Sequence, residues 1–289
     1  MNPFTGGCHY SAGCKRYQTG CGWCPQLGPK HQDDLSRRIF KRKEKAYKGC
    51  NIHIVTLSKW FDDCVRKSSL FKNFPTSIIP HGIPHDIFKK RDRCFSRDRL
   101  NLPQDKTLIL FGTDYKTERK GFKYLQEALR LLKNKIDPST IALVIFGPKQ
   151  DLDRLSKDVR FPLYELGYIQ DEALLSAAYS GCDMFVIPSI EEAFGLTCLE
   201  AMACGTPVVG FNTGGILDMV ISHKTGFLAE LKNTEGLADK IEYMITHPEE
   251  REEMGLNARK LVEQEYILQI QAKRYLKLYE TMLSASRSP

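Results

Sequence analysis

Features that mark membrane-spanning or exported proteins are missing from this sequence. It contains no uninterrupted apolar stretch of about eighteen residues, the length that a membrane-spanning helix needs. The segment from Met1 to Thr19 has no apolar core of the kind that a signal peptide carries. These absences lead us to expect a cytoplasmic protein.

The sequence also lacks internal repeats, low-complexity tracts and a G-x-G-x-x-G motif after an apolar strand. The last absence argues against a dinucleotide-dependent oxidoreductase. What remains is the composition of an ordinary globular protein, with 42% hydrophobic and 27% charged residues. The 289 residues are enough for one large domain or two modest ones.

The chain is mildly basic, with a net charge of +7 and an isoelectric point near 8.8. This excess suits an anionic ligand or an anionic surface and does not by itself indicate nucleic acid, so we expect no nucleic-acid partner. Basic residues gather only in Arg37–Lys48. That run is typical of a solvated helix face, and a peripheral contact with the inner membrane surface is the alternative.

Ten cysteines are distributed unevenly, and four of them fall within the first 24 residues. Cys8, Cys14, Cys21 and Cys24 form the pattern C-x5-C-x6-C-x2-C, which offers four thiolates for a tetrahedral structural zinc site. The spacing is not that of a standard zinc finger, so free thiols or a redox pair stay open. His9 is a further ligand, an active-site residue or a plain loop histidine.

Short apolar runs alternate with helical patterns over most of the chain. We expect strands at Ile52–Leu57, Ser77–Pro80, Thr107–Gly112, Ile141–Phe146, Leu166–Ile169, Asp183–Ile187 and Pro207–Phe211. We expect helices from Ser58 to about Arg66, at Gly121–Lys135, Asp171–Ser180 and Phe194–Cys204, and near 234–246, 248–264 and 268–283. A small helical stretch should precede Leu166.

This alternation predicts an α/β fold, in which a parallel sheet carries helices on both faces. Ligands of such sheets bind beyond the carboxyl ends of the strands. The loops after Phe111, Phe146, Ile187 and Phe211 are therefore the places to look for a site.

The loop after Ile187 opens the helix Phe194–Cys204 and contains Gly195. Backbone N–H groups at the start of a helix point toward the ligand at the positive end of the helix dipole, which makes this a phosphate site. Gly195 would allow a ligand to approach the backbone closely.

Glu200 lies inside that helix, on the face shared by Leu196 and Cys204. A carboxylate among apolar neighbours costs several kcal/mol unless it has a partner, on the order given for buried charges. The partner is a protein cation or a ligand hydroxyl, and a purely structural pair is the alternative. Glu192, alone in its loop, would more often be a solvated charge.

The spacing of Glu192 and Glu200 within PSIEEAFGLTCLEAMACGTPVVG is more specific than either residue. This run resembles the signature of glycosyltransferase family four, whose members are retaining enzymes with the GT-B fold. The resemblance extends over residues 50–285. It includes the segments Ile79–Ile83, Gly112…Arg119-Lys120-Gly121, Leu166–Ile169, Thr213–Gly215 and Thr225–Leu228.

The resemblance implies roles for the two glutamates and for the start of the helix. Glu192 would hydrogen-bond a hydroxyl of the donor sugar, and Glu200 would hold the ribose hydroxyls of the nucleotide. The diphosphate would bind at the backbone amides near Phe194, Gly195 and Leu196.

The resemblance also implies that Lys120 neutralises the diphosphate while the bond to the sugar breaks, which fits a fixed cation beside a developing dianion. A solvated lysine before a helix is the alternative. The family often has an arginine after the glycine that ends the strand, whereas Thr113 follows Gly112 here. Gly112 would line the donor site, and Arg119 could supply the second cation.

Members of this family need no catalytic metal, so the resemblance implies a nucleotide-diphosphate sugar, of UDP or GDP type, as the only small-molecule requirement. The sugar would pass, with retention of configuration, to a glycan or lipid-linked acceptor. The donor phosphate would help to remove the acceptor's proton. A related epimerase or phosphorylase is less favoured because Glu192 and Glu200 occur together in this run.

We expect residues 1–85 to be a remnant of an N-terminal acceptor domain, with the cysteine-rich segment and a connector. Residues 86–265 should form the Rossmann-like donor domain, and residues 266–289 a helix that packs back toward the N-terminal part. About 80 residues are too few for a complete acceptor domain. The alternative is therefore an inactive nucleotide-sugar-binding subunit, or one that works with a separate N-terminal chain.

Overall fold

The structure, a computed structural model, describes residues 2–28, 31–112, 117–133, 135–148 and 161–285. The chain divides into two compact units, Met1–Pro80 and His81–Pro289, and each is described on its own. The division falls inside residues 77–88, the connector expected from sequence. The identification of the first unit with an acceptor-domain remnant stays a prediction.

The first unit contains a parallel β-α-β element. Strands β1 (Ile54–Thr56) and β2 (Thr76–Ile78) pair in parallel, and helix α2 (Lys59–Lys67) lies between them in the sequence. The side chain of Ser58 caps α2 by accepting a hydrogen bond from the Phe61 N–H, as expected for a serine before an apolar helix.

Helix α1 (Leu35–Tyr47) covers most of the basic run, and only Ser36 and Phe40 of its residues are buried. The helix predicted there is present with a largely solvated surface. Before it, among the described residues, the only regular element is the short 3-10 helix η1 (Arg16–Gln18). A small aromatic core holds the unit, made of Phe4, Tyr17, Phe40, Cys64, Val65, Leu70 and Phe71.

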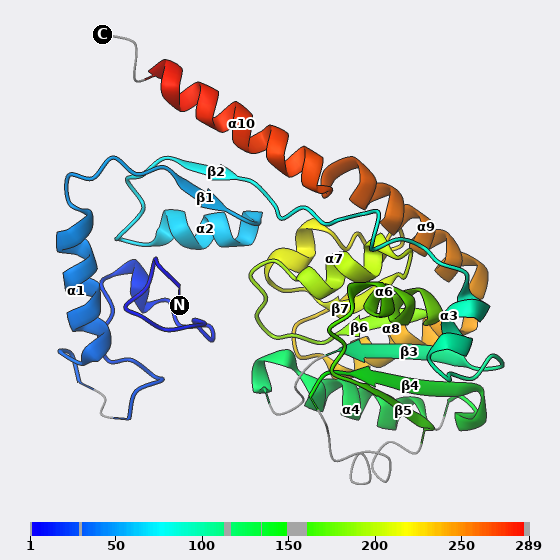
Figure 1. Ribbon diagram of the computed structural model, residues 1–289. Coiled ribbons are helices and arrows are strands. Elements are labelled where there is room, and N and C mark those ends of the chain that lie inside the picture. Colours follow the sequence, from blue (N-terminus) through cyan, green and yellow to red (C-terminus); the bar gives the residue numbers. More distant parts are fainter. Residues whose placement is uncertain (1, 29–30, 113–116, 134, 149–160, 286–289) are drawn as a thin grey trace. The chain divides into compact units, whose positions relative to one another are not determined.

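The second unit is built on a six-stranded, wholly parallel sheet with the order β5-β4-β3-β6-β7-β8 (Figure 1). The strands are β3 (Thr107–Gly112), β4 (Ile141–Phe146), β5 (Leu163–Gly167), β6 (Met184–Ile187), β7 (Val208–Phe211) and β8 (Gly226–Ala229). The strand order changes direction between β3 and β6, which are hydrogen-bonded neighbours. In doubly wound sheets this is the point at which ligands bind.

Helices cover both faces of this sheet, which confirms the predicted fold class (Figure 1). One face packs against α4 (Phe122–Leu132) and α8 (Thr234–Thr246) around a core that includes Phe111, Leu125 and Ile241. The other carries α6 (Glu172–Gly181) and α7 (Leu196–Ala203), with α3 (Arg93–Arg99) packed on α6. Because both faces are covered, the four inner strands β4, β3, β6 and β7 are largely apolar rather than alternating.

Two helices end the chain, α9 (Pro248–Glu265) and α10 (Leu268–Ala285). The connector, residues 77–88, contacts the start of α10. The Gly82 N–H donates a hydrogen bond to Gln271 Oε1 at 3.0 Å, and Ile83 forms a parallel β-bridge with Ile267. The packing of this helix toward the N-terminal part remains a prediction. Within the described residues, no helix has the length and apolar character needed to span a membrane.

Some predicted elements were placed wrongly or missed. The strand predicted at Leu166–Ile169 begins earlier, at Leu163, and ends at Gly167, whose left-handed φ of 67° breaks the extended backbone. The helical stretch predicted before it falls in 149–160, outside the described residues. Helix α3 and strand β8 had not been predicted. Three-residue 3-10 turns also occur at η2 (Glu118–Lys120) and η3 (Pro138–Thr140), and a longer one at η4 (Gly214–Asp218).

A buried charge network attaches the outer helices to the amino end of the sheet. The Asp183 carboxylate accepts hydrogen bonds from Arg97 Nη2 at 2.7 Å and Arg251 Nη2 at 3.3 Å, and from the Leu108 N–H. Arg97 is itself 3% exposed and donates to several backbone carbonyls. The aspartate therefore joins α3 and α9 to β3 and β6.

Candidate functional site

The loop after β6, residues 188–195, lies at the point where the strand order changes direction. It is held by the segments that follow the neighbouring strands β3 and β7. The Ile190 N–H donates to the Arg119 carbonyl at 2.8 Å, and Thr213 Oγ1 donates to the Ile190 carbonyl at 3.1 Å. The loop is therefore fixed before any ligand arrives.

The glycine pair after β7 holds the backbone of Glu192. The Gly215 N–H donates to the Glu192 carbonyl at 2.8 Å. Gly214 has a left-handed φ of 57°, and a Cβ there would overlap the same carbonyl oxygen. The Thr213-Gly214-Gly215 motif is thus explained by its close approach to the glutamate loop.

Glu192 is 8% exposed and forms the centre of a charge cluster. Its Oε2 lies 3.0 Å from Lys120 Nζ and 3.2 Å from Arg119 Nη1. Arg119 Nη1 also donates to the Glu191 carbonyl at 2.9 Å. Glu192 thus draws two cations, Lys120 and Arg119, to one place, and such a pair suits an anionic ligand.

The start of α7 lies directly after this loop. Gly195 is its N-cap with a φ of 98°, and no side chain that the structure describes caps the helix. Among the described residues, Phe194 is buried against the rings of His81 and Tyr266, with centroids 5.4 and 6.2 Å away, whereas Leu196 is 49% exposed. The positive end of this helix is therefore available to an anion through its backbone amides.

Glu200, one turn into α7, has a protein partner that the sequence did not identify. Tyr179 Oη, from α6, donates a hydrogen bond to Glu200 Oε2 at 2.8 Å. Burial raises the pKa of Glu200 to about 7, although the tyrosine hydrogen bond opposes this rise. Burial and the adjacent Glu200 carboxylate raise the pKa of Tyr179 well above its usual value, so it remains a donor.

A small pocket joins the ends of β3 and β6 to the start of α7. It is lined by Phe111, Gly112, Lys120, Val186, Ile187, Pro188, Ser189 and Thr197. A Cβ on Gly112 would overlap the Phe146 ring, which explains the glycine at the strand end. Ser189 is 1% exposed, and its hydroxyl has no hydrogen-bond partner among the described residues. Thr113 lies outside them.

The structure therefore brings Lys120, Arg119 and Glu192 into direct contact, and it places Gly112 and Lys120 on one pocket. Gly195 and Leu196 lie at the start of the helix that carries Glu200. Sequence reasoning missed Tyr179 and Ser189. The one available signal was the requirement that Glu200 have a partner.

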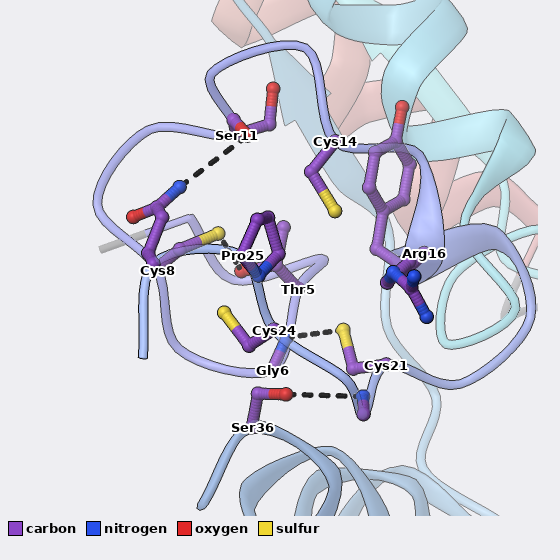
Figure 2. Close-up of a pocket in the computed structure, with 13 residues that line it drawn as sticks. Thr5, Gly6, Cys8, Ser11, Cys14, Arg16, Cys21, Cys24, Pro25 and Ser36 are labelled. Carbon is purple, nitrogen blue, oxygen red and sulfur yellow. Dashed lines mark hydrogen bonds between the residues drawn. The ribbon is translucent and has the colours of Figure 1, made fainter. Parts of the chain in front are cut away.

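The four N-terminal cysteines line one cavity in the first unit (Figure 2). All four are free thiols and partly exposed. Burial, together with the nearby Cys8, Cys14 and Cys24, raises the pKa of Cys21 to about 11. Within the part of the chain that the structure describes, no three cysteine, histidine or acidic side chains are arranged so that they could hold a metal ion.

Comparison with known proteins identifies the second unit most clearly. The model of the family described as glycosyl transferases group 1 matches residues 92–261. An uncharacterized glycosyltransferase of Methanocaldococcus jannaschii, MJ1607, is 30% identical over 91% of this chain and 67% of its own length. The capsular polysaccharide biosynthesis glycosyltransferase CapM of Staphylococcus aureus is 36% identical over 84% of this chain and 65% of its own.

Among solved structures, Anabaena HepE in complex with UDP and glucose superposes with a TM-score of 0.69. The superposition covers 84% of this chain and 66% of that one, at 19% identity, and shows a common fold. Several further relatives are matched over less than half of their own length.

Proposed function

The chain belongs to the glycosyl transferases group 1 family, and from this premise we propose that it transfers a sugar from a nucleotide-diphosphate sugar to a glycan or lipid-linked acceptor. One observation carries the proposal: the cations Lys120 and Arg119, both bound to Glu192, lie at the carboxyl edge of β3 and β6. That edge is where a doubly wound sheet binds nucleotides.

The reaction breaks the bond between the anomeric carbon and the donor phosphate, and its electron pair passes to the phosphate oxygen. Charge therefore grows on the diphosphate in the transition state. Lys120, Arg119 and the amides at the start of α7 stabilise this charge without reorganising, because the structure already fixes them. Glu192 holds both cations in place and accepts a hydrogen bond from the donor sugar.

The acceptor hydroxyl forms the new bond to the anomeric carbon, and its proton goes to the departing phosphate. We propose retention of configuration, as the family resemblance implies. The anomeric proton coupling of the product, measured by NMR, distinguishes retention from inversion.

Glu200 holds the nucleotide through the ribose hydroxyls, which are donors that a carboxylate accepts well. Its fixed position on α7, with Tyr179 on one oxygen, leaves the rest of the carboxylate for the ribose. We favour a uridine donor because HepE, which shares the fold, was solved with UDP and glucose. A guanosine donor is the alternative that the experiment decides.

A cell-envelope polysaccharide is the acceptor class that CapM's name supports. Arg37 and Lys43 of α1 donate hydrogen bonds to backbone carbonyls within the first unit. This use of their charges argues against a contact between α1 and an anionic membrane.

The test is thermal unfolding of the full chain with UDP, GDP, ADP and their common sugars. A ligand at a hundred times its Kd stabilises by about 2.7 kcal/mol, which corresponds to a shift of several degrees at roughly 2–4 °C per kcal/mol. We expect one nucleotide class to give this shift. Lys120→Ala and Glu200→Ala should abolish it.

Lys123→Ala is the matched control, because Lys123 is an exposed lysine on the adjacent helix α4. A cooperative unfolding transition that no nucleotide moves contradicts the donor site. A nucleotide shift without sugar transfer or donor hydrolysis identifies the chain as a nucleotide-sugar-binding subunit that depends on another chain.

A further inference from the structure

Four cysteine side chains line a cavity within the N-terminal segment of the first unit. Besides Cys8, Cys14, Cys21 and Cys24, its lining includes Arg16 (Figure 2). The volume open to the centre of a water-sized sphere is about 30 Å³. On this measure one water needs roughly 10–15 Å³, so the space is large enough for a small bound group.

The backbone is shaped to present these side chains. Cys21, Gly22 and Trp23 all have left-handed φ angles, of 56°, 98° and 50°. Non-glycine residues adopt this conformation at a cost, and it persists where the surroundings determine it. The Gly6 N–H donates to Cys21 Sγ at 3.2 Å, an amide-to-sulfur contact that stabilises a thiolate more than a thiol.

Helix α1 and its cap anchor the segment that carries the cysteines. Lys43 Nζ donates to the Thr5 carbonyl at 2.9 Å, and Arg37 Nη1 donates to the Gly20 carbonyl at 2.9 Å. The Asp34 carboxylate accepts a hydrogen bond from the Cys24 N–H at 2.6 Å. Two cations and the Asp34 carboxylate therefore stand beside the cysteine loop, and the cations would compensate part of the negative charge of a group bound by four thiolates.

We propose that Cys8, Cys14, Cys21 and Cys24 bind a structural metal centre through their four thiolates, as one zinc ion or one iron–sulfur cluster. Four thiolates are the donor set that these two centres share. Binding releases the thiol protons to solvent. The centre ties together a segment whose only regular element, among the described residues, is η1.

The two centres differ in what they require of the side chains. No three of the described thiols are arranged as ligands of a single ion, so zinc would require the cysteines to rotate inward to metal–sulfur distances of about 2.3 Å. A cluster of four iron and four sulfide ions spans a wider ring of thiolates, since each cysteine binds a different iron.

The test begins with the unmodified full chain, purified without chelators and without oxygen. Mass spectrometry of the dissolved metals should find about one zinc or about four iron atoms per chain. Titration of the native protein with a mercurial should release the metal in proportion to the thiols modified. This measurement needs no variant and so does not depend on how a variant folds.

Cys14→Ser and Cys24→Ser should lose most of the metal. Cys50→Ser and Cys94→Ser are matched controls, because both cysteines are exposed and lie outside the cavity lining; they should retain it. A chain that holds less than a tenth of an equivalent of zinc and iron, and takes up neither zinc nor iron with sulfide, overturns the proposal. So does metal that stays bound when Cys14 and Cys24 are replaced.

Discussion

The raised pKa of Glu200 makes the affinity for a nucleotide depend on pH in a way that can be calculated. Burial brings this pKa to about 7, so the carboxylate that we propose accepts the ribose hydroxyls is only partly populated near neutrality. When only the ionised form is competent, the apparent Kd equals the intrinsic Kd divided by the ionised fraction. That fraction is about one tenth at pH 6 and about nine tenths at pH 8.

We therefore expect affinity to fall about tenfold from pH 8 to pH 6, which is about 1.4 kcal/mol. The direction follows from the raised pKa: the protonated form is stable in the free protein, and ligand binding draws the proton off. Calorimetric titration with UDP-glucose suits the measurement, because its diphosphate has no proton to lose in this range. GDP-mannose replaces it if thermal shifts favour guanosine.

Two variants separate this effect from a general effect of pH. Glu200→Gln cannot ionise, so its weaker affinity should stay constant from pH 6 to pH 8. Tyr179→Phe removes the hydrogen bond that opposes the rise in pKa, so the midpoint should move above 7. A wild-type affinity that does not change over this range, or an equal slope in Glu200→Gln, would refute the reasoning.

Two further predictions concern buried polar groups. Ser189→Ala should leave the free protein as stable as before or slightly more stable, because the hydroxyl is buried without a described partner. It should weaken nucleotide binding by about 0.5–1.5 kcal/mol if the ligand supplies that partner; thermal melts and calorimetry test both parts, and a destabilised free protein contradicts the premise. Asp183→Asn should destabilise by about 3–5 kcal/mol, as expected when a buried pair is broken, with little change in nucleotide affinity. Chemical denaturation measures the loss, and Asp239→Asn, at an exposed ion pair, is the control that should lose almost nothing.

The elements that sequence identified correctly are those whose pattern is local. Strands β3, β4, β6 and β7 are continuous apolar runs, as strands buried on both faces must be. Helix α3 has no such pattern, since it is short and rich in arginine. It is held by Arg97 and Asp183, which are distant in sequence. Strand β8 begins at a glycine and spans only Gly226–Ala229, so its pairing with β7 determines it.

The candidate site shows the same division between local and distant information. The need of Glu200 for a partner follows from its apolar helix, but the partner, Tyr179, is on another helix. The contact of Lys120 with Glu192 depends on β3 and β6 being neighbours. That adjacency reverses the direction of the strand order and is invisible in a list of strands. Types of residue were therefore predictable at this site, whereas their pairing was not.

The proposed donor site places a carboxylate among the cations that would bind a dianion. Lys120 and Arg119 have flexible side chains, and ordering either one costs conformational entropy. Glu192, whose backbone is held by Gly214 and Gly215, orders both side chains in the free protein, so this entropy is lost before the ligand binds. The cations are then already in place when the diphosphate arrives, and their field acts on the charge that develops there. In the proposed mechanism, a carboxylate that would weaken donor binding by simple repulsion thus serves transfer, because it fixes the groups that would stabilise the leaving diphosphate.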